Sequence, residues 1–114
     1  MDEQNEILNS MVLELRRGTI ILSVLSQLEA PQYGYYLVQK LAENGLTVDP
    51  GTLYPLLRRL EKQGLLNSTW DTSEARPRKY YLLSPTGREV YHKLQTEWKI
   101  MIRSIESLIN EGGS

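Results

Sequence analysis

The side chains of this chain best suited to chemistry are cationic, and they gather in one segment. Of the 114 residues, 13 are Lys or Arg and 14 are Asp or Glu, which gives a formal net charge of −1. Between Pro50 and Tyr80, six Lys/Arg stand against Glu61, Asp71 and Glu74, so this segment carries +3 and the remainder of the chain −4. Local field rather than net charge attracts a polyanion. The segment is therefore a candidate nucleic-acid-binding surface.

Residues suited to catalysis or metal binding are scarce. His92 is the single histidine, and no Ser, Cys or Asp stands nearby in the sequence as its partner. The chain has no cysteine, which excludes disulfides and Cys-based metal sites. No His/Cys/Asp/Glu cluster has metal-ligand spacing, and no glycine-rich phosphate loop is present. We expect a protein that is not an enzyme and that uses no cofactor or metal.

Length and composition indicate one small domain. A chain of 114 residues with 40% hydrophobic residues can bury a modest single core. No apolar run approaches the ~20 residues that a membrane span needs. The acidic start of the chain, MDEQNE, is also unlike that of a secretion signal. We expect a cytoplasmic protein with no membrane partner.

The cationic segment begins with an expected helix. Asp49 and Pro50 provide a capping side chain followed by proline, a typical helix start, and Gly64 marks its end. Leucines recur at i, i+3, i+4 and i+7 and form one apolar stripe, made of Leu53, Leu56, Leu57 and Leu60. The opposite side carries small and cationic residues, namely Gly51, Pro55, Arg58, Arg59 and Lys62. Such a helix can bury one face and bring the other close to phosphates.

Two β-rich runs follow this helix, and we expect them to form a hairpin. They cover about residues 66–70 and 79–83, with turn residues between them. Arg76 and Arg78 lie in the connection, next to Lys79. A helix followed by a basic hairpin is the plan of a winged-helix nucleic-acid binder. The alternative is that these charges are only solvated, as on most amphipathic surface helices.

The two ends of the chain carry apolar stripes that one small domain cannot cover. We expect a first helix over about residues 3–28, with a kink at Gly18 and opposed apolar faces in its two halves. A long final helix starts at Ser84–Pro85. The residues expected to form a dimer interface are Leu8, Met11, Val12, Leu15, Leu94, Trp98, Met101, Ile105 and Leu108. For the first half, the alternative is an arm packed on the chain's own C-terminal helix.

The expected fold is mainly α with a small β-hairpin: a winged helix-turn-helix domain with long N- and C-terminal dimerisation helices. Residues 1–28 form the N-terminal helix, whose first half serves dimerisation and whose second half enters the core. Residues 29–84 form the winged helix-turn-helix region, which begins with a helix of about residues 33–43 ended by Gly45. Residues 85–114 form the C-terminal dimerisation helix. The whole is a single folded domain.

Two motifs in the middle of the chain resemble the PadR family of winged-helix transcriptional regulators. They are GTLYPLLRRLEKQGLL, residues 51–66, and RPRKYYLLSPTGRE, residues 76–89. Upstream, LRRGTIILSVLSQL and YGYYLVQKL resemble the first two helical segments of the family. The resemblance runs from about Leu15 to Leu108. One departure is Tyr33, where the family often has a histidine before Gly-Tyr.

The resemblance implies a homodimeric, sequence-specific transcriptional regulator that binds double-stranded DNA, most simply a ligand-responsive repressor on an inverted-repeat operator. The expected DNA-binding residues are Tyr33, Thr52, Tyr54, Pro55, Arg58, Arg76, Arg78 and Lys79. One helix is expected to enter the major groove, where Thr52 and Tyr54 position the helix and Arg58 contacts a phosphate or a guanine. The hairpin cations hold flanking phosphates or the minor groove.

Trp98 is expected to pack on the dimer interface, and the resemblance adds a second role for it. Some family members bind phenolic acids or flat aromatic drugs near that interface, so Trp98 is also a candidate contact for a small aromatic effector. Trp70, Tyr80 and Tyr81 are expected to pack on the hairpin or in the core. Two alternatives stay open: a winged helix that binds only protein, and a small-molecule sensor without DNA function.

Overall fold

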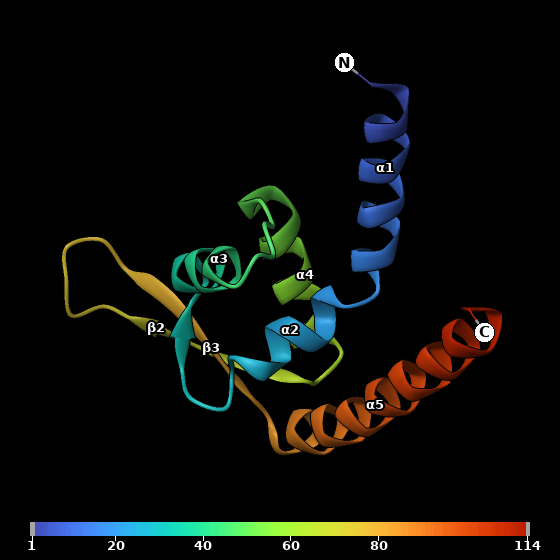
Figure 1. Ribbon diagram of the computed structural model, residues 1–114. Coiled ribbons are helices and arrows are strands. Elements are labelled where there is room, and N and C mark those ends of the chain that lie inside the picture. Colours follow the sequence, from blue (N-terminus) through green and yellow to red (C-terminus); the bar gives the residue numbers. More distant parts are fainter. Residues whose placement is uncertain (1, 114) are drawn as a thin grey trace.

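The computed structural model describes residues 2–113, and over this range the chain forms five helices and three short strands. The helices are α1 (Glu3–Arg17), α2 (Ile20–Ser26), α3 (Gly34–Glu43), α4 (Pro50–Lys62) and α5 (Pro85–Gly113). The strands are β1 (Gln32–Tyr33), β2 (Leu66–Asp71) and β3 (Arg78–Leu83). Figure 1 shows α2, α3 and α4 gathered beside the sheet, with α1 and α5 projecting from this centre. The expected fold class, mainly helical with a small sheet, is confirmed.

The sheet is antiparallel and has the strand order β1-β3-β2. Strands β2 and β3 form the expected hairpin, in register from Leu66 opposite Leu83 to Asp71 opposite Arg78. We call residues 66–83, the two strands and their connection, the wing. Strand β1 pairs with β3 on the other side and was not predicted. Two residues are too few to show an alternating pattern, so Tyr33 was expected at the start of a helix.

Local signals explain where the helices begin and end. The side chain of Asp49 accepts a hydrogen bond from Thr52 N at 3.0 Å and caps α4, as expected. Gly45 and Gly64 both have φ of +83°, the left-handed conformation that lets the chain leave α3 and α4. The expected single helix of residues 3–28 is wrong, because the chain breaks at Gly18–Thr19 into α1 and α2. Thr19 donates through both its backbone N and its Oγ1 to Arg16 O, at 2.9 and 2.8 Å, which closes the end of α1.

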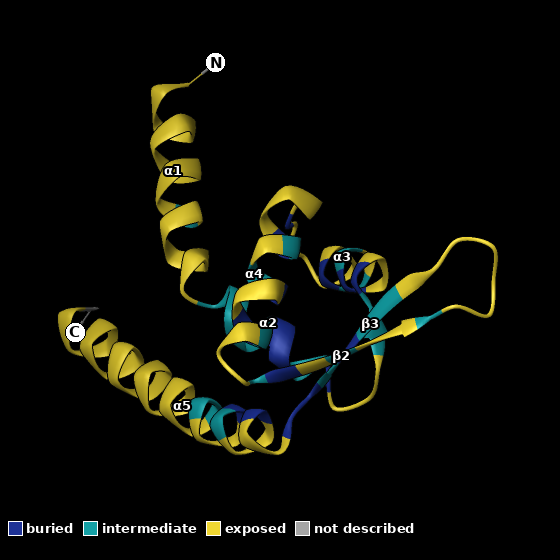
Figure 2. Cartoon of the chain, turned by 180° about the vertical axis from the view of Figure 1, so that it is seen from behind, coloured by how far each residue is buried: buried dark blue, intermediate teal, exposed yellow. Residues whose placement is uncertain are grey.

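The core lies where α2, α3, α4, the sheet and the start of α5 meet. Of the predicted stripe on α4, Leu53, Leu57 and Leu60 are buried and Leu56 is half-buried. Leucines from the neighbouring helices complete the core, among them Leu25, Leu28, Leu37 and Leu41. Figure 2 shows the buried residues in this centre and exposed residues over α1 and most of α5. The buried face of α4 leaves its opposite face free.

The direction of α5 is fixed by Ser84 at its start. Ser84 Oγ donates to Gly64 O at 2.6 Å and accepts from Gly87 N at 2.9 Å. A Cβ atom on Gly87 would overlap with the carbonyl of Leu65, so glycine permits this close approach. The α4–β2 connection therefore anchors the long helix.

The two terminal helices expose their apolar stripes. Helix α1 has no buried residue, so the alternative of an arm packed along the chain's own C-terminal helix does not describe this structure. Leu15 is 75% exposed, Met101 55% and Leu108 67%. Two predicted dimer residues are less exposed, because Leu94 is half-buried against the core and Val12 is half-buried on α1.

Candidate nucleic-acid interface

A groove of about 900 Å³ lies between the wing, the start of α3 and the exposed side of α4. Six of the eight residues expected to bind DNA line it: Tyr33, Tyr54, Arg58, Arg76, Arg78 and Lys79. The other two, Thr52 and Pro55, are exposed on α4 but do not line the groove. Three segments that are separate in the sequence thus bring most of the predicted residues to one surface.

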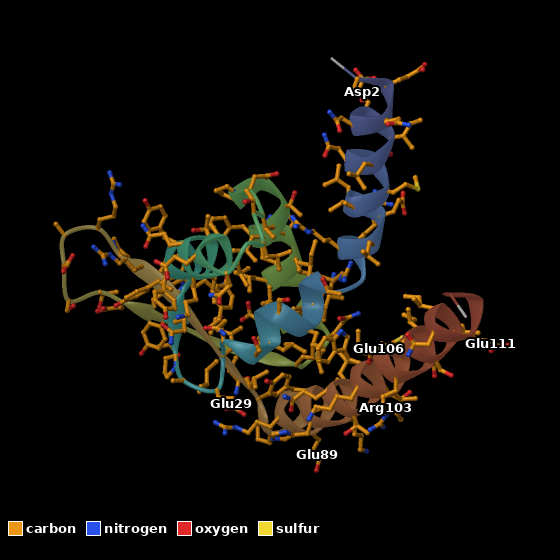
Figure 3. All side chains as sticks on the ribbon, in the orientation of Figure 1. Asp2, Glu29, Glu89, Arg103, Glu106 and Glu111 are labelled. Atoms are coloured by element: carbon orange, nitrogen blue, oxygen red, sulfur yellow. The ribbon has the colours of Figure 1, made fainter. Side chains whose placement is uncertain are left out.

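The charged side chains that line the groove are all cationic. Four of the described residues that line it are Lys or Arg, and none is Asp or Glu. Within residues 2–113, neither Arg58 nor Arg76 forms an ion pair. Figure 3 labels acidic residues that lie away from the wing: Asp2 caps α1, Glu29 follows α2, and Glu89, Glu106 and Glu111 lie on α5. The acidic residues beside the groove are engaged, since Glu74 pairs with Arg78 and Glu61 with Lys79.

The wing is tied to β1 by Tyr33. Its hydroxyl donates to Asp71 Oδ2 at 2.7 Å, and its ring meets that of Tyr80 edge to face at 5.8 Å. The guanidinium of Arg78 lies 5.4 Å from the centre of the Tyr33 ring. The hydrogen bond to Asp71 raises the pKa of Tyr33. Tyr33 thus lines the groove with a hydroxyl that is already engaged, and its visible role is to hold the wing.

Asp71 is the other half of this connection. Its Oδ1 accepts hydrogen bonds from Ser73 Oγ at 2.7 Å and Ser73 N at 3.0 Å. These bonds, together with that from Tyr33, lower the pKa of Asp71 to about 2. The carboxylate is therefore charged at neutral pH and organises the turn that carries Arg76.

A second connection joins the wing to α4 through Glu61. Ser68 Oγ donates to this carboxylate, and Lys79 Nζ lies 3.3 Å from Glu61 Oε1. The bond from Ser68, followed by the interaction with Lys79, lowers the pKa of Glu61. The same ammonium lies 5.4 Å from the ring centre of Tyr81 and 5.9 Å from that of Trp70. Lys79 is thus the most constrained cation of the groove.

Aromatic residues line the groove beyond those predicted. Tyr81 is buried, as expected, whereas Trp70 is 60% exposed and so lies outside the core, on the hairpin beside Lys79. Trp70 stands opposite Lys79 in the register of the hairpin, beyond the end of the core. Tyr35 is 65% exposed and Tyr36 also lines the groove. These aromatic residues come close to the cations through contacts between segments far apart in the sequence, so their position in the groove could not be predicted. For Trp70, the polar turn that follows it in the sequence does indicate an exposed side chain.

Tyr54 reaches the groove because Gly34 leaves room for it. A Cβ atom on Gly34 would overlap with the Tyr54 ring, so glycine at the start of α3 lets the ring lie against the backbone. At the N-terminus of α4, the amide and the hydroxyl of Thr52 both donate to Asp49. The amide of Thr52 is therefore engaged by the capping carboxylate and is not free to bind a phosphate.

A smaller pocket of about 420 Å³ lies between α2 and α5. Trp98, the candidate effector contact, lines it and is 41% exposed. Tyr91, Leu22 and Ser26 lie on the same lining. Trp98 therefore lines a pocket that is formed within a single chain.

Across the described range 2–113, no three His, Cys, Asp or Glu side chains gather as metal ligands. In the same range, no helix is long and apolar enough to cross a bilayer.

Comparisons with known proteins agree on one family. The model of the transcriptional regulator PadR-like family matches residues 21–93. A crystal structure of a PadR family transcriptional regulator from Eggerthella lenta is 47% identical, with a TM-score of 0.89, and the match covers 93% of this chain and 95% of that one. A PadR-like transcriptional regulator from Bacillus cereus is 27% identical with a TM-score of 0.76, covering 84% of this chain and 96% of the other.

A curated relative gives the same indication. Transcriptional regulator Rv3488 of Mycobacterium tuberculosis is 40% identical over 76 residues, which are 66% of this chain and 71% of the relative. These similar proteins are transcriptional regulators rather than enzymes.

Proposed function

Because this chain belongs to the PadR-like family of transcriptional regulators, we propose that it is a repressor that binds an inverted-repeat operator as a homodimer. DNA-binding transcriptional regulation follows from the family, and the repressor role, the operator symmetry and the dimer are the proposal. The observation that carries it is the groove between the wing, α3 and α4, in which four cations line the described surface without an acidic residue. A surface of this kind is the electrostatic footprint of a nucleic-acid binder.

Helix α4 is proposed to enter the major groove. Its buried side is occupied by the core leucines, so its exposed side, with Thr52, Pro55 and Arg58, is available to DNA. Arg58 is proposed to contact a guanine or a phosphate, since a guanidinium can bind either through two parallel hydrogen bonds. Tyr54 is proposed to position the helix beside the backbone.

The wing is proposed to hold the flanking phosphates or the minor groove. Arg76 is the leading candidate, because it is exposed and forms no ion pair within the described chain. Arg78 has an exposed partner, Glu74, at 3.4 Å, and exposed pairs of this kind exchange readily with a phosphate. Lys79 is the weakest of the three, since Glu61 already neutralises part of its charge. Tyr33 is proposed to act by fixing the wing.

The terminal helices are proposed to form the dimer interface. On α1, Leu8, Met11 and Leu15 are exposed within one chain and Val12 is half-buried. On α5, the exposed stripe consists of Trp98, Met101, Ile105 and Leu108. Large exposed apolar patches mark interaction sites. A two-fold axis between these helices would present two copies of α4 to half-sites about one helical turn, ~34–36 Å, apart.

A small aromatic molecule is proposed as an effector near Trp98. The pocket that Trp98 lines lies between α2 and α5, and α5 is the helix that would carry the partner. A ligand that binds one angle between the protomers better than another shifts the population of DNA-competent dimers. A regulator of this kind acts in the cytoplasm, where the operator is.

Selection of duplexes from a random pool by the purified protein tests the proposal. We expect enrichment of an inverted repeat, a dimer in light scattering, and reduced reporter expression when the selected site overlaps a promoter. Enrichment of no sequence, with binding to a protein partner instead, would favour a protein-binding winged helix. A response to aromatic compounds without any duplex binding would favour the sensor alternative.

A further inference from the structure

We propose that the groove between the wing and α3 binds a planar aromatic anion, and that this ligand excludes duplex DNA from the same surface. The second half of this inference rests on the proposed DNA-binding function, whereas the first half does not. The ligand would combine a flat ring with a phosphate or a carboxylate. Its site is separate from the pocket at Trp98.

The exposed rings of the groove are the first reason. Trp70 is 60% exposed and Tyr35 65% exposed, and they stand on different elements that border the same groove. Bases inside a duplex are stacked on each other and offer only their edges in the grooves, so duplex binding gives these ring faces no stacking partner. A small planar molecule does offer one, because aromatic rings pack in offset stacks or edge to face.

The charge of the groove is the second reason. Arg58 and Arg76 are without ion pairs in the described chain, and no described lining residue is acidic. A guanidinium matches a carboxylate or a phosphate with two parallel hydrogen bonds. The surface therefore selects an anion over a neutral ring.

Size and rigidity are the third reason. The groove of about 900 Å³ falls within the range of ~300–1,000 Å³ that is usual for small-molecule sites. Its walls are held by the Tyr33–Asp71 hydrogen bond and by the Glu61–Lys79 ion pair. Lys79 also lies 5.9 Å from the centre of the Trp70 ring, which favours one orientation of that ring. A site ordered in this way before binding loses less entropy when the ligand enters.

Competition with DNA follows from shared residues. The anion would occupy Arg58 and Arg76, the same guanidiniums that we assign to the operator. Binding of either partner must then weaken binding of the other by the same factor, because coupling between ligands is reciprocal. The groove would thus act as a direct release site for the operator.

The test uses the fluorescence of the two tryptophans, Trp70 and Trp98. In the full chain with Trp98→Phe, Trp70 is the only indole, and in Trp70→Phe the only indole is Trp98. The probes are guanosine monophosphate and 2-naphthoate, with guanosine and 2-naphthol as matched neutral controls. We expect saturable quenching of Trp70 by at least one of the two anions, with the neutral controls binding about tenfold more weakly. Which anion responds identifies phosphate or carboxylate as the preferred group.

Substitutions in the groove complete the test. Arg76→Ala should weaken binding of the anion that quenches Trp70 about tenfold. Arg103→Ala on α5, outside the groove, should leave this binding unchanged. Equal binding of neutral and anionic probes, a response found only in the chain that retains Trp98, or no saturable response would overturn the inference. Binding of a single-stranded oligonucleotide with no response to either anion would also overturn it. If one variant does not fold, the other and the parent chain still assign the signal.

A duplex titration separates this inference from the proposed function. The anion that quenches Trp70 should raise the apparent Kd of the operator by a factor of one plus the ratio of the anion concentration to the Kd of the anion. Duplex binding that is unaffected by a saturating anion would refute the competition. Quenching by the anion without any duplex binding would refute the proposed function and leave the ligand site standing.

Discussion

Lys79 Nζ lies 3.3 Å from Glu61 Oε1, so an ion pair joins the wing to α4 beside the groove. The two side chains are 28% and 33% exposed, so solvent screens this pair only in part. The pair holds two elements that are both proposed to contact DNA. It also removes part of the charge that Lys79 could offer to a phosphate.

Lys79→Ala is therefore expected to change the salt dependence of duplex binding less than Arg76→Ala. Each phosphate contact contributes about 0.9 to the slope of log affinity against log salt concentration. Arg76→Ala should flatten the slope by about that amount, and Lys79→Ala by clearly less, although both lower affinity. A full unit of flattening for Lys79→Ala would show that it leaves Glu61 and binds a phosphate in the complex.

Asp71 should make the wing sensitive to acid. Its pKa in the folded chain is about 2, below the ordinary value of roughly 3.9. Because the folded pKa is depressed, the stabilisation is present above the ordinary pKa and is lost as the pH falls from about 4 towards 2. The protection of the β2–β3 amides against hydrogen exchange, relative to an unfolded chain at the same pH, should fall in the parent over this range and fall less in Asp71→Asn. An identical pH profile in both proteins would mean that Asp71 does not hold the wing.

Gly34→Ala is expected to destabilise the chain and to weaken duplex binding together. The new Cβ would overlap with the Tyr54 ring, and relieving this overlap costs ~1–3 kcal/mol of folding free energy. Gly18→Ala is the matched control, because its Cβ meets open space and its φ of −74° suits alanine. That control should be neutral or slightly stabilising. Equal thermal stabilities of the two variants would contradict the assigned role of Gly34.

Removal of the residues after Lys93 should abolish the dimer. The truncation takes away the exposed stripe of α5, including Trp98 and Ile105, and leaves the start of the helix anchored by Ser84. Light scattering should find monomeric or aggregated protein. As a milder variant, Met101→Glu should weaken the dimer without removing the helix. A soluble, folded dimer from the truncated chain would refute the proposed interface.

The parts of the fold that could be predicted from the sequence depend on local signals. Asp49–Pro50 and Gly64 mark the ends of α4, and its leucine stripe identifies the buried face, so this helix and its exposed cations were predicted correctly. The hairpin was also found, because its two runs are bounded by turn residues. The position of the break at Gly18 was predicted correctly, but a kink was expected where the helix in fact ends. The hydrogen bonds from Thr19 to Arg16 O close α1 at this point and separate it from α2.

The parts that could not be predicted depend on contacts between distant residues. Tyr33 and Asp71 are 38 positions apart, and their hydrogen bond fixes both β1 and the wing. The fit of Tyr54 against Gly34 likewise requires α3 and α4 to be packed first. For the same reason, the basic residues of the binding surface could be predicted from the sequence, whereas the position of Trp70 and Tyr35 beside them could not.

The central claim is that the groove side of α4 and the wing bind DNA. Its most direct test is a salt titration of the affinity of Arg58→Ala and Arg76→Ala for the selected operator and for random duplex. Arg58→Ala should cost ~1–3 kcal/mol on the operator and less on random DNA if it reads a base. Arg76→Ala should weaken both duplexes alike and flatten the slope by about 0.9. Unchanged affinity and slope in both variants would contradict the account, because this surface would then not touch DNA.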